Sequence, residues 1–240
     1  MSFLWDQLSS AVPLIVHRDP YVMGLLWVTI RVAIVSTSAA IVIGLPLGAA
    51  LGIGRFRGRR ALQLLANASL ALPAVVVGVG VLLLVLQQGV LGSLHLAFTL
   101  RAVYIAQAIL ALPYIVALTP AAIQALAPGL LDQARVLGAG RAQLATFALR
   151  EAKIGVIAAV ITALGAAISE VGAVVIVGGN IQGHDQTLAS ALLDQFNYTA
   201  HQPYEVAIGL VLLALLVLLI GTLTVIQQRA GGIQLRFRTA

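Results

Sequence analysis

The chain has very little charge for its length. Only 9% of its 240 residues are Asp, Glu, Lys or Arg, whereas 60% are hydrophobic. A soluble domain carries roughly 25% charged residues, so this composition cannot cover a water-exposed surface. It argues strongly against a soluble enzyme or a soluble nucleic-acid-binding domain, and it indicates a membrane protein.

Several chemical signatures are also missing. The chain has no cysteine, which excludes a disulfide scaffold, a cysteine–zinc site and a cysteine nucleophile. It has no G-x-x-x-x-G-K-[ST] phosphate-binding loop, so any use of ATP requires a separate ATPase chain. No two of its histidines have the spacing of three or four residues that puts two metal ligands on one helix face. We therefore expect no catalytic residue, no metal site and no cofactor in this chain, and do not expect it to be an enzyme.

Long intervals between charged residues predict the membrane-spanning segments. A membrane helix needs about 20 apolar residues, and such intervals predict an all-α, polytopic membrane protein with about five transmembrane helices. We place them at 22–54, 61–87, 102–125, 154–179 and 205–227. Residues 1–21 are then an N-terminal extracytoplasmic segment with an interfacial helix over 3–16, residues 22–228 the transmembrane domain, and residues 229–240 a cytoplasmic tail.

The basic residues predict the orientation in the membrane. Eleven of the 14 Lys and Arg residues follow the first span, lie between the third and fourth, or follow the fifth. Lys and Arg accumulate in cytoplasmic loops, so we expect the N-terminus outside and the C-terminus in the cytoplasm. The net charge of +6 is then a topology signal and not a nucleic-acid-binding surface.

Glycines in the spans favour close helix packing. Small residues let membrane helices approach one another, and Gly78, Gly80, Gly165 and Gly172 lie within predicted spans. The pair Gly178-Gly179 is expected to end the fourth span so that the chain can turn.

The longest predicted cytoplasmic loop, 125–153, contains the signals of a short helix. Pro128 suits a first helical turn and Gly138 suits the position just past a helix end. Between them Leu131, Ala134 and Leu137 share one face, whereas Asp132 and Arg135 point elsewhere. A helix of about ten residues is too short to be stable alone in water. It therefore lies against the membrane or its own bundle, or another protein binds it.

This loop resembles a motif of ABC importer permeases. Asp132-Gln133-Ala134 followed by Gly138 is similar to their EAA-x-x-x-G loop, with Asp-Gln in place of Glu-Ala. Other stretches are similar to the tungstate-type permeases, which are relatives of the molybdate permeases. These stretches are Phe56-Arg57-Gly58-Arg59-Arg60, Leu72-Pro73-Ala74-Val75-Val76-Val77-Gly78, Leu149-Arg150-Glu151-Ala152-Lys153, and Ser169-Glu170-Val171-Gly172-Ala173 running into Val177-Gly178-Gly179-Asn180-Ile181. The resemblance covers about residues 20–228 and departs from the family over 184–202.

The resemblance implies a type I ABC importer permease for an oxyanion, most closely tungstate. In that family the permease is a homodimer that works with two ATPase subunits and an extracytoplasmic binding protein in the inner membrane. ATP closes the ATPase dimer and opens the cavity outward, and hydrolysis resets it. The residues that match the coupling helix, and would contact the ATPase, are Asp132, Gln133, Ala134, Leu137 and Gly138.

Polar residues in the spans suggest two further sites. Arg31 and Glu170 lie at a similar depth, about 14 Å from the outer boundary at 1.5 Å per residue, so we expect an ion pair. Arg31 attracting an oxyanion is the alternative. Ser169, Asn180 and Thr187 lie near the outer end of the fourth span and are candidates for the substrate path, because an oxyanion needs hydrogen-bond donors that hold it weakly.

Two alternative functions stay open. A secondary, ion-coupled transporter would need a proton or sodium site, usually within inverted repeats, and the spans show only one acidic residue and no convincing repeat. A permease for another oxyanion, such as molybdate or sulfate, is the other alternative, because the residues do not separate these anions from tungstate.

Overall fold

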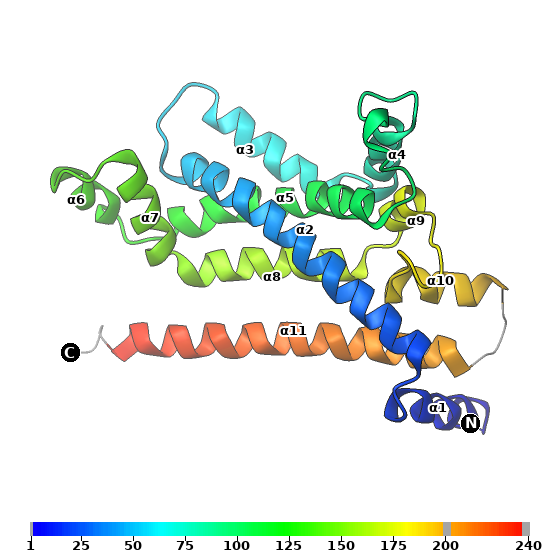
Figure 1. The fold of residues 1–240 in the computed structure, drawn as a ribbon. Coiled ribbons are helices and arrows are strands. Elements are labelled where there is room, and N and C mark those ends of the chain that lie inside the picture. The colour runs from blue at the N-terminus through cyan, green and yellow to red at the C-terminus, as the bar shows by residue number, and fades with distance from the viewer. Residues whose placement is uncertain (1, 199–202, 237–240) are drawn as a thin grey trace. The chain divides into compact units, whose positions relative to one another are not determined.

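The structure is a computed structural model that describes residues 2–198 and 203–236. All regular elements in these ranges are helices, which confirms the all-α prediction (Figure 1). The longer ones are α2 (Pro20–Ile53), α5 (Leu100–Gln124), α8 (Lys153–Ser169) and α11 (Pro203–Arg236). The others are α1 (Ser2–Val16), α3 (Arg59–Ala68), α4 (Ala74–Val85), α6 (Leu130–Val136), α7 (Arg141–Glu151), α9 (Gly172–Gly178) and α10 (Leu188–Tyr198), with short 3₁₀ turns η1 (Ser69–Ala71) and η2 (Gly92–Leu94).

Three described helices are long and apolar enough to cross a membrane. They are Pro20–Ile53, Leu100–Gln124 and the Pro203–Arg229 part of α11. Two bent pairs pass the same test together: Arg59–Ala71 with Ala74–Val85, bent by 99°, and Arg141–Glu151 with Lys153–Ser169, bent by 79°. If each bent pair is one span, the described residues contain five spans, the predicted number. The second pair, however, begins at Arg141 within the predicted loop 125–153 and ends at Ser169, so its bounds differ from the predicted span 154–179.

The second predicted span, 61–87, is not a continuous helix. It breaks between η1 and α4, where Leu72 and Pro73 are both extended, with ψ angles of 127° and 123°. Proline has no N–H to donate and disfavours the helical conformation for the residue before it. The break therefore follows from Pro73, whereas Pro46, Pro113 and Pro120 are accommodated inside α2 and α5.

The fourth predicted span, 154–179, is wrong as a single helix. The helix α8 ends at Ser169, and a separate helix, α9, begins at Gly172. Glu170 lies at the break, and its Oε1 accepts a hydrogen bond from the Ala173 N–H at 3.3 Å. This carboxylate satisfies an N–H at the first turn of α9 that would otherwise lack an acceptor, so the charged residue favours a new helix start over a continuous helix.

The chain divides into two compact units. The first comprises residues 1–36, 73–110 and 165–219, and the second residues 37–72, 111–164 and 220–240. Both units contain residues of the predicted transmembrane domain. Four helices contribute residues to each unit: α2, α5, α8 and α11.

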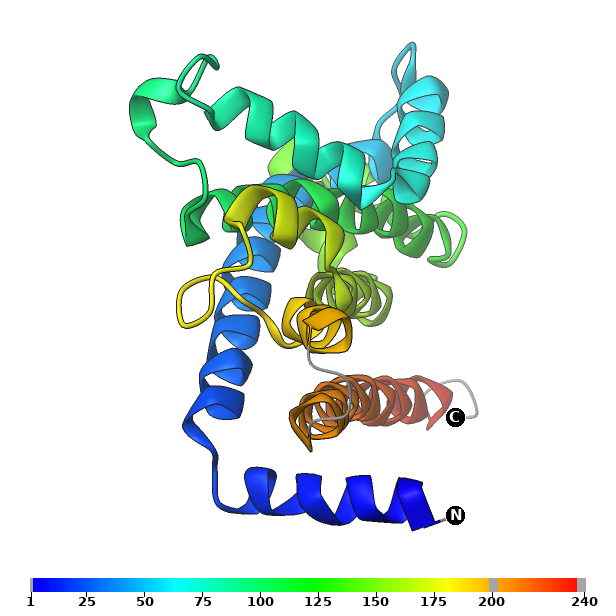
Figure 2. The same ribbon diagram turned by 90° about the vertical axis from the view of Figure 1, so that its right-hand side faces the viewer.

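In the first unit, α4 and α9 pack closely. Figures 1 and 2 both show α9 beside α4. A Cβ atom on Gly78 would lie 2.9 Å from the Ala173 Cα, and one on Gly172 would lie 2.8 Å from the Val75 Cγ2. Close approach at these two glycines is as predicted, whereas Gly80 has no atom within 4 Å of such a Cβ. A separate apolar cluster in this unit joins α1, the start of α2, α10 and the start of α11 through Ala11, Val22, Leu188 and Ile208.

In the second unit, a glycine stripe on α2 packs against α5. Gly44, Gly48 and Gly52 recur every four residues on α2. A Cβ on each would lie 2.9 Å from Ile115 Cγ2, 2.7 Å from Thr119 Cβ and 2.9 Å from Ile123 Cδ1, respectively. Spacing by four places small residues on one helix face, so this stripe is visible in the sequence.

Candidate functional site

The predicted cytoplasmic loop contains a short helix held between two glycines. Gly129 and Gly138 have φ angles of +81° and +86°, and α6 runs between them. The Gly138 and Ala139 N–H groups donate to the Arg135 and Ala134 carbonyls, both at 3.0 Å. This is the bonding pattern that ends a helix at a left-handed glycine, so the predicted role of Gly138 is confirmed. Pro128 precedes the helix instead of starting it, because Gly129 takes the left-handed conformation before Leu130.

The side chains of α6 do not form the single apolar face that we predicted. Leu131 packs against the cluster formed by Ala49, Ile123, Ala148 and Ala152. Leu137 is 87% exposed and Val136 is 86% exposed. Leu137 departs from the Leu131 face because the helix ends at Val136 and the chain turns at Gly138. Two adjacent apolar side chains thus lie exposed at the end of α6.

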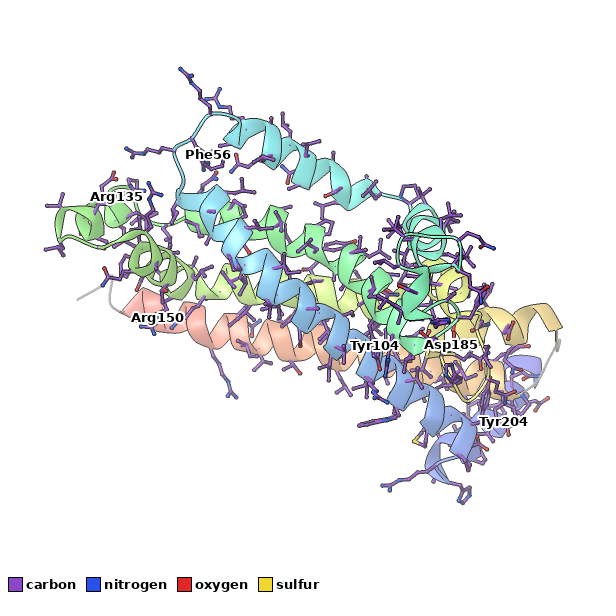
Figure 3. All side chains as sticks on the ribbon, turned by 45° about the horizontal axis from the view of Figure 1, so that its top comes forward. Phe56, Tyr104, Arg135, Arg150, Asp185 and Tyr204 are labelled. Atoms are coloured by element: carbon purple, nitrogen blue, oxygen red, sulfur yellow. The ribbon has the colours of Figure 1, made fainter. Side chains whose placement is uncertain are left out.

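The polar side chains of α6 bind the end of α2. Arg135 Nη2 donates to the Ile53 carbonyl at 3.1 Å, and Arg135 Nη1 forms an ion pair with Asp132. Asp132 also pairs with Arg55, at 3.4 Å between Nη2 and Oδ1. Figure 3 shows Arg135 near the C-terminal end of α2. These side chains line a cavity of about 280 Å³ together with Gly52, Arg59 and Gln124.

The structure places two of the three candidate substrate-path residues together. Thr187 and Ser190 cap the start of α10 reciprocally: the Ser190 N–H donates to Thr187 Oγ1 at 3.2 Å, and the Thr187 N–H donates to Ser190 Oγ at 2.9 Å. Asn180 has a φ of +56°, and its Nδ2 reaches the Ser190 carbonyl at 3.5 Å. Ser169 lies apart at the exposed end of α8, where its hydroxyl donates to the Gly165 carbonyl at 2.9 Å.

Asp185 organises the turn between α9 and α10 and was not among the predicted site residues. This carboxylate is fully buried and accepts hydrogen bonds from the Asn180 N–H at 3.1 Å and the Ile181 N–H at 2.9 Å. A Cβ on Gly178 would collide with the Asp185 carboxylate, so Gly178 must be glycine here. The predicted end of the helix at Gly178-Gly179 is confirmed, with Gly179 at a φ of +93°. A single acidic residue in an otherwise uncharged turn between apolar segments was the available signal.

The predicted pair of Arg31 and Glu170 is not formed in this structure. Across residues 2–198 and 203–236, the ion pairs join Asp132 to Arg55 and Arg135, and the His184 imidazole lies 3.5 Å from the Asp185 carboxylate. Arg31 is exposed, and Glu170 instead accepts the bond from the Ala173 N–H. Equal depth along two helices does not specify whether the two side chains face each other.

Gln107 is a second polar residue that was not among the predicted site residues. It lies in α5 and is fully buried, and neither its Nε2 nor its Oε1 has a hydrogen-bond partner among the described residues. The hydroxyl of Tyr104, one turn earlier and labelled in Figure 3, is likewise buried without a partner in the part of the chain that the structure describes. A lone glutamine within an apolar run was the signal for this position.

The sequence over residues 44–231 matches the family described as "Binding-protein-dependent transport system inner membrane component". The chain belongs to this family. It is 33% identical over 213 residues to the tungstate uptake system permease protein TupB of Peptoclostridium acidaminophilum, covering 89% of this chain and 93% of that protein. It is also 33% identical to a probable anion ABC transporter permease of Haloferax volcanii, over 91% of this chain and 92% of that one.

The fold comparison agrees with this family of inner membrane components. A solved inward-facing structure of the MetNI methionine ABC transporter matches with a TM-score of 0.71. The match covers 88% of this chain and 98% of that one, at 20% sequence identity, and therefore shows the fold. The resemblance to ABC importer permeases inferred from the sequence is thus confirmed. The chain is a multi-pass membrane component of a binding-protein-dependent transport system.

Proposed function

We propose that this chain is the membrane-spanning permease subunit of an ATP-driven importer for a tetrahedral oxyanion, with tungstate as its first substrate. The observation that carries the proposal is the similarity to a tungstate permease over nearly the full length of both chains. A second relative named as an anion permease supports the same substrate class. Because the chain has no phosphate-binding loop, ATP is bound and hydrolysed by a separate partner.

The ATPase docks on α6. Val136 and Leu137 offer an exposed apolar pair next to exposed polar groups of Asp132 and Gln133. An exposed apolar cluster rimmed by polar residues is typical of a protein–protein contact. The left-handed turn at Gly138 fixes the direction in which the pair projects. The same loop carries a large share of the basic residues that predict the cytoplasmic side.

The remaining partners follow the same family pattern. The permease works as a homodimer, receives the oxyanion from an extracytoplasmic binding protein, and keeps its N-terminus outside and its C-terminus in the cytoplasm. Alternating access moves the anion inward: ATP binding opens the path to the binding protein, and hydrolysis opens it to the cytoplasm. The distribution of Lys and Arg supports the orientation.

The substrate path includes Ser169, Asn180 and Thr187, with Arg31 as a further attracting charge. Ser169 and Arg31 are exposed in the described chain, so neither is enclosed by the packed helices. Asn180 and Thr187 hold each other through Ser190, so they shape the path more than they bind the anion. A path with few polar groups and one delocalised positive charge binds an oxyanion weakly enough to release it.

Reconstitution tests this proposal. The permease, its ATPase and its binding protein are placed in vesicles, and uptake of tungstate, molybdate and sulfate is compared with and without ATP. We expect tungstate uptake that requires ATP and the binding protein. Uptake that persists without ATP and follows an ion gradient would contradict the proposal and favour a secondary transporter. ATP-driven uptake of molybdate or sulfate in preference to tungstate would retain the ATP-driven importer and correct its substrate.

A further inference from the structure

Side chains from two other helices bind three consecutive carbonyls at the C-terminus of α2. Arg59 of α3 donates from Nε to the Leu51 carbonyl at 2.6 Å and from Nη2 to the Gly52 carbonyl at 3.1 Å. Arg135 of α6 donates to the next one, the Ile53 carbonyl, at 3.1 Å. The last carbonyls of a helix have no partner within the helix and lie at its negative end. Arginines are therefore well suited to this position, and these hydrogen bonds are charge-assisted.

Arg135 joins this helix end to α6 in particular. Besides Ile53, it binds Asp132 within α6, and Asp132 binds Arg55 in the loop after α2. We call these four residues, Ile53, Arg55, Asp132 and Arg135, the α2–α6 clamp. Within the clamp, Arg135 and Ile53 are 82 positions apart in the sequence. A loop helix of only seven residues is thus tied to the end of a 34-residue helix.

The four residues of the clamp do not contribute equally. The side chains of Arg55 and Asp132 are 79% and 59% exposed, so water and salt weaken their attraction. The Arg135 side chain is only 32% exposed, and its acceptor on α2 is a backbone carbonyl that cannot move away by changing rotamer. Arg135 is therefore the central residue of the clamp.

Apolar packing joins the same two helices. Leu131 of α6 packs against the cluster that includes Ala49 of α2 and Ile123 of α5. Gly52 of α2 also lies directly against Ile123, a member of this cluster. Rigid, closely packed elements transmit displacement because they deform little. A displacement of α6 is thus transmitted to this part of α2 through both a polar and an apolar contact.

We propose that Arg135 is a positioning residue that makes α6 and the C-terminal part of α2 move as one body, so that movement of the ATPase reaches α2 directly. This proposal rests on the proposed function, because it assigns the transmission step that follows ATPase docking. Arg135 itself contacts neither the anion nor ATP. Its role is to transmit the movement of the ATPase from α6 to α2.

The transport test uses the complete complex in vesicles and three variants. Arg135→Gln removes the charge and the forked donor, and Arg135→Lys keeps a charged donor. Arg57→Gln is the matched control, because Arg57 is an exposed arginine of the neighbouring loop with no hydrogen bond or ion pair in the described chain. Anion uptake, ATP hydrolysis and ATPase co-purification are measured for each. For Arg135→Gln we expect a loss of uptake per ATP of about fivefold or more, the lower end of typical coupling energies, with the ATPase still bound.

The lysine variant and the Arg57 control distinguish a loss of movement transmission from a loss of folding. Arg135→Lys should recover part of the uptake per ATP, and Arg57→Gln should leave it unchanged. The proposal is overturned if Arg135→Gln transports as efficiently as the parent, if it loses the ATPase together with uptake, or if Arg57→Gln loses as much. A parent complex that takes up no anion with ATP would instead contradict the proposed function.

A distance measurement tests the clamp without any transport. Because the chain has no cysteine, spin labels attach only at Val42→Cys on α2 and Gln133→Cys on α6. An excess of unlabelled permease leaves one labelled chain in each homodimer, so that the distance within one chain is measured. Val42 is 73% exposed and Gln133 is also exposed, so labels fit there without repacking. We expect a narrow distance distribution in the parent and in Arg57→Gln, and a broader one in Arg135→Gln. Equal widths in all three proteins would overturn the proposal even if uptake changes.

Discussion

Gly48 of α2 lies directly against Thr119 of α5, so closely that a Cβ atom on Gly48 would be 2.7 Å from the Thr119 Cβ. Membrane helices have little hydrophobic driving force for association, because lipid tails are as apolar as their side chains. Close backbone approach at small residues replaces that force with van der Waals contact. The Gly44, Gly48 and Gly52 stripe is therefore central to the second unit.

Gly48→Ala should destabilise the permease by about 1–3 kcal/mol, the usual range for overpacking a filled interface. The added methyl group meets a β-branched side chain, which has few alternative rotamers. Gly24→Ala is the matched control, because Gly24 lies in the same helix and a Cβ added there would have no atom within 4 Å. Thermal unfolding in detergent measures both. Equal midpoints for the two variants would contradict direct packing at Gly48.

Leu137→Asp should abolish co-purification with the ATPase while leaving the fold intact. The side chain is 87% exposed, so the change removes no internal packing, and a charge at the centre of an apolar contact opposes docking. Leu137→Met keeps an apolar group and should bind the ATPase normally. Co-purification of the Leu137→Asp variant at the parent level would exclude Leu137 from the docking surface.

Gly138→Ala should weaken the ATPase complex by disturbing the turn after α6. Gly138 has a φ of +86°, a conformation that costs a residue with a side chain about 1–2 kcal/mol. Gly140→Ala is the control two residues later, where φ is −67° and the nearest atom to an added Cβ would be 3.6 Å away. Titration of the ATPase against both variants should show weaker binding for Gly138→Ala alone. Unchanged affinity for both would mean that the turn geometry is not needed for docking.

The sequence predicts the helices well because their determinants are local. Hydropathy requires an apolar run wherever a helix crosses lipid, and charged residues interrupt such runs. Whether a helix continues through an interruption depends on its packing. The chain breaks at Pro73 and at Glu170 but continues through Pro113 and Pro120. Neighbouring helices decide which freed backbone groups are satisfied, and one sequence does not specify those neighbours.

The predicted site residues show the same limit. Gly138 was predictable because a left-handed helix end favours glycine in any surroundings. The partners of Arg135, Asp185 and Glu170 were not predictable, because each is a backbone group or an acceptor chosen by the fold. Periodicity places side chains on a face of a helix, but the elements packed against that face decide what they touch.

Gln107→Leu should keep or raise the stability of the permease. Neither polar atom of this buried amide has a partner in the described chain, and such a group costs about 1–3 kcal/mol when its hydrogen bonds are unmet. Leucine has a similar volume and no polar atom. Thermal unfolding and anion uptake are measured together. A large loss of stability would show that Gln107 has a water molecule or another partner, and a loss of uptake alone would place it on the substrate path.

Asp185→Asn should destabilise the turn between α9 and α10 by about 1–3 kcal/mol, the cost of leaving a buried polar group unsatisfied. The carboxylate accepts hydrogen bonds from two N–H groups, those of Asn180 and Ile181. An amide of the same shape offers one oxygen and turns its NH₂ group toward the second donor. Two donors then face each other in a site where Asp185 is fully buried.

His184→Gln is the control for this variant. The His184 side chain is 54% exposed and lies 3.5 Å from the same carboxylate, so its loss tests whether the nearby imidazole is what stabilises the turn. We expect a lower unfolding midpoint for Asp185→Asn and almost no change for His184→Gln. If the histidine variant is the less stable one, the contact between His184 and Asp185 stabilises the turn. If Asp185→Asn is the less stable variant, the hydrogen bonds from the Asn180 and Ile181 N–H groups stabilise the turn. These bonds also fix the position of Asn180 beside Ser190.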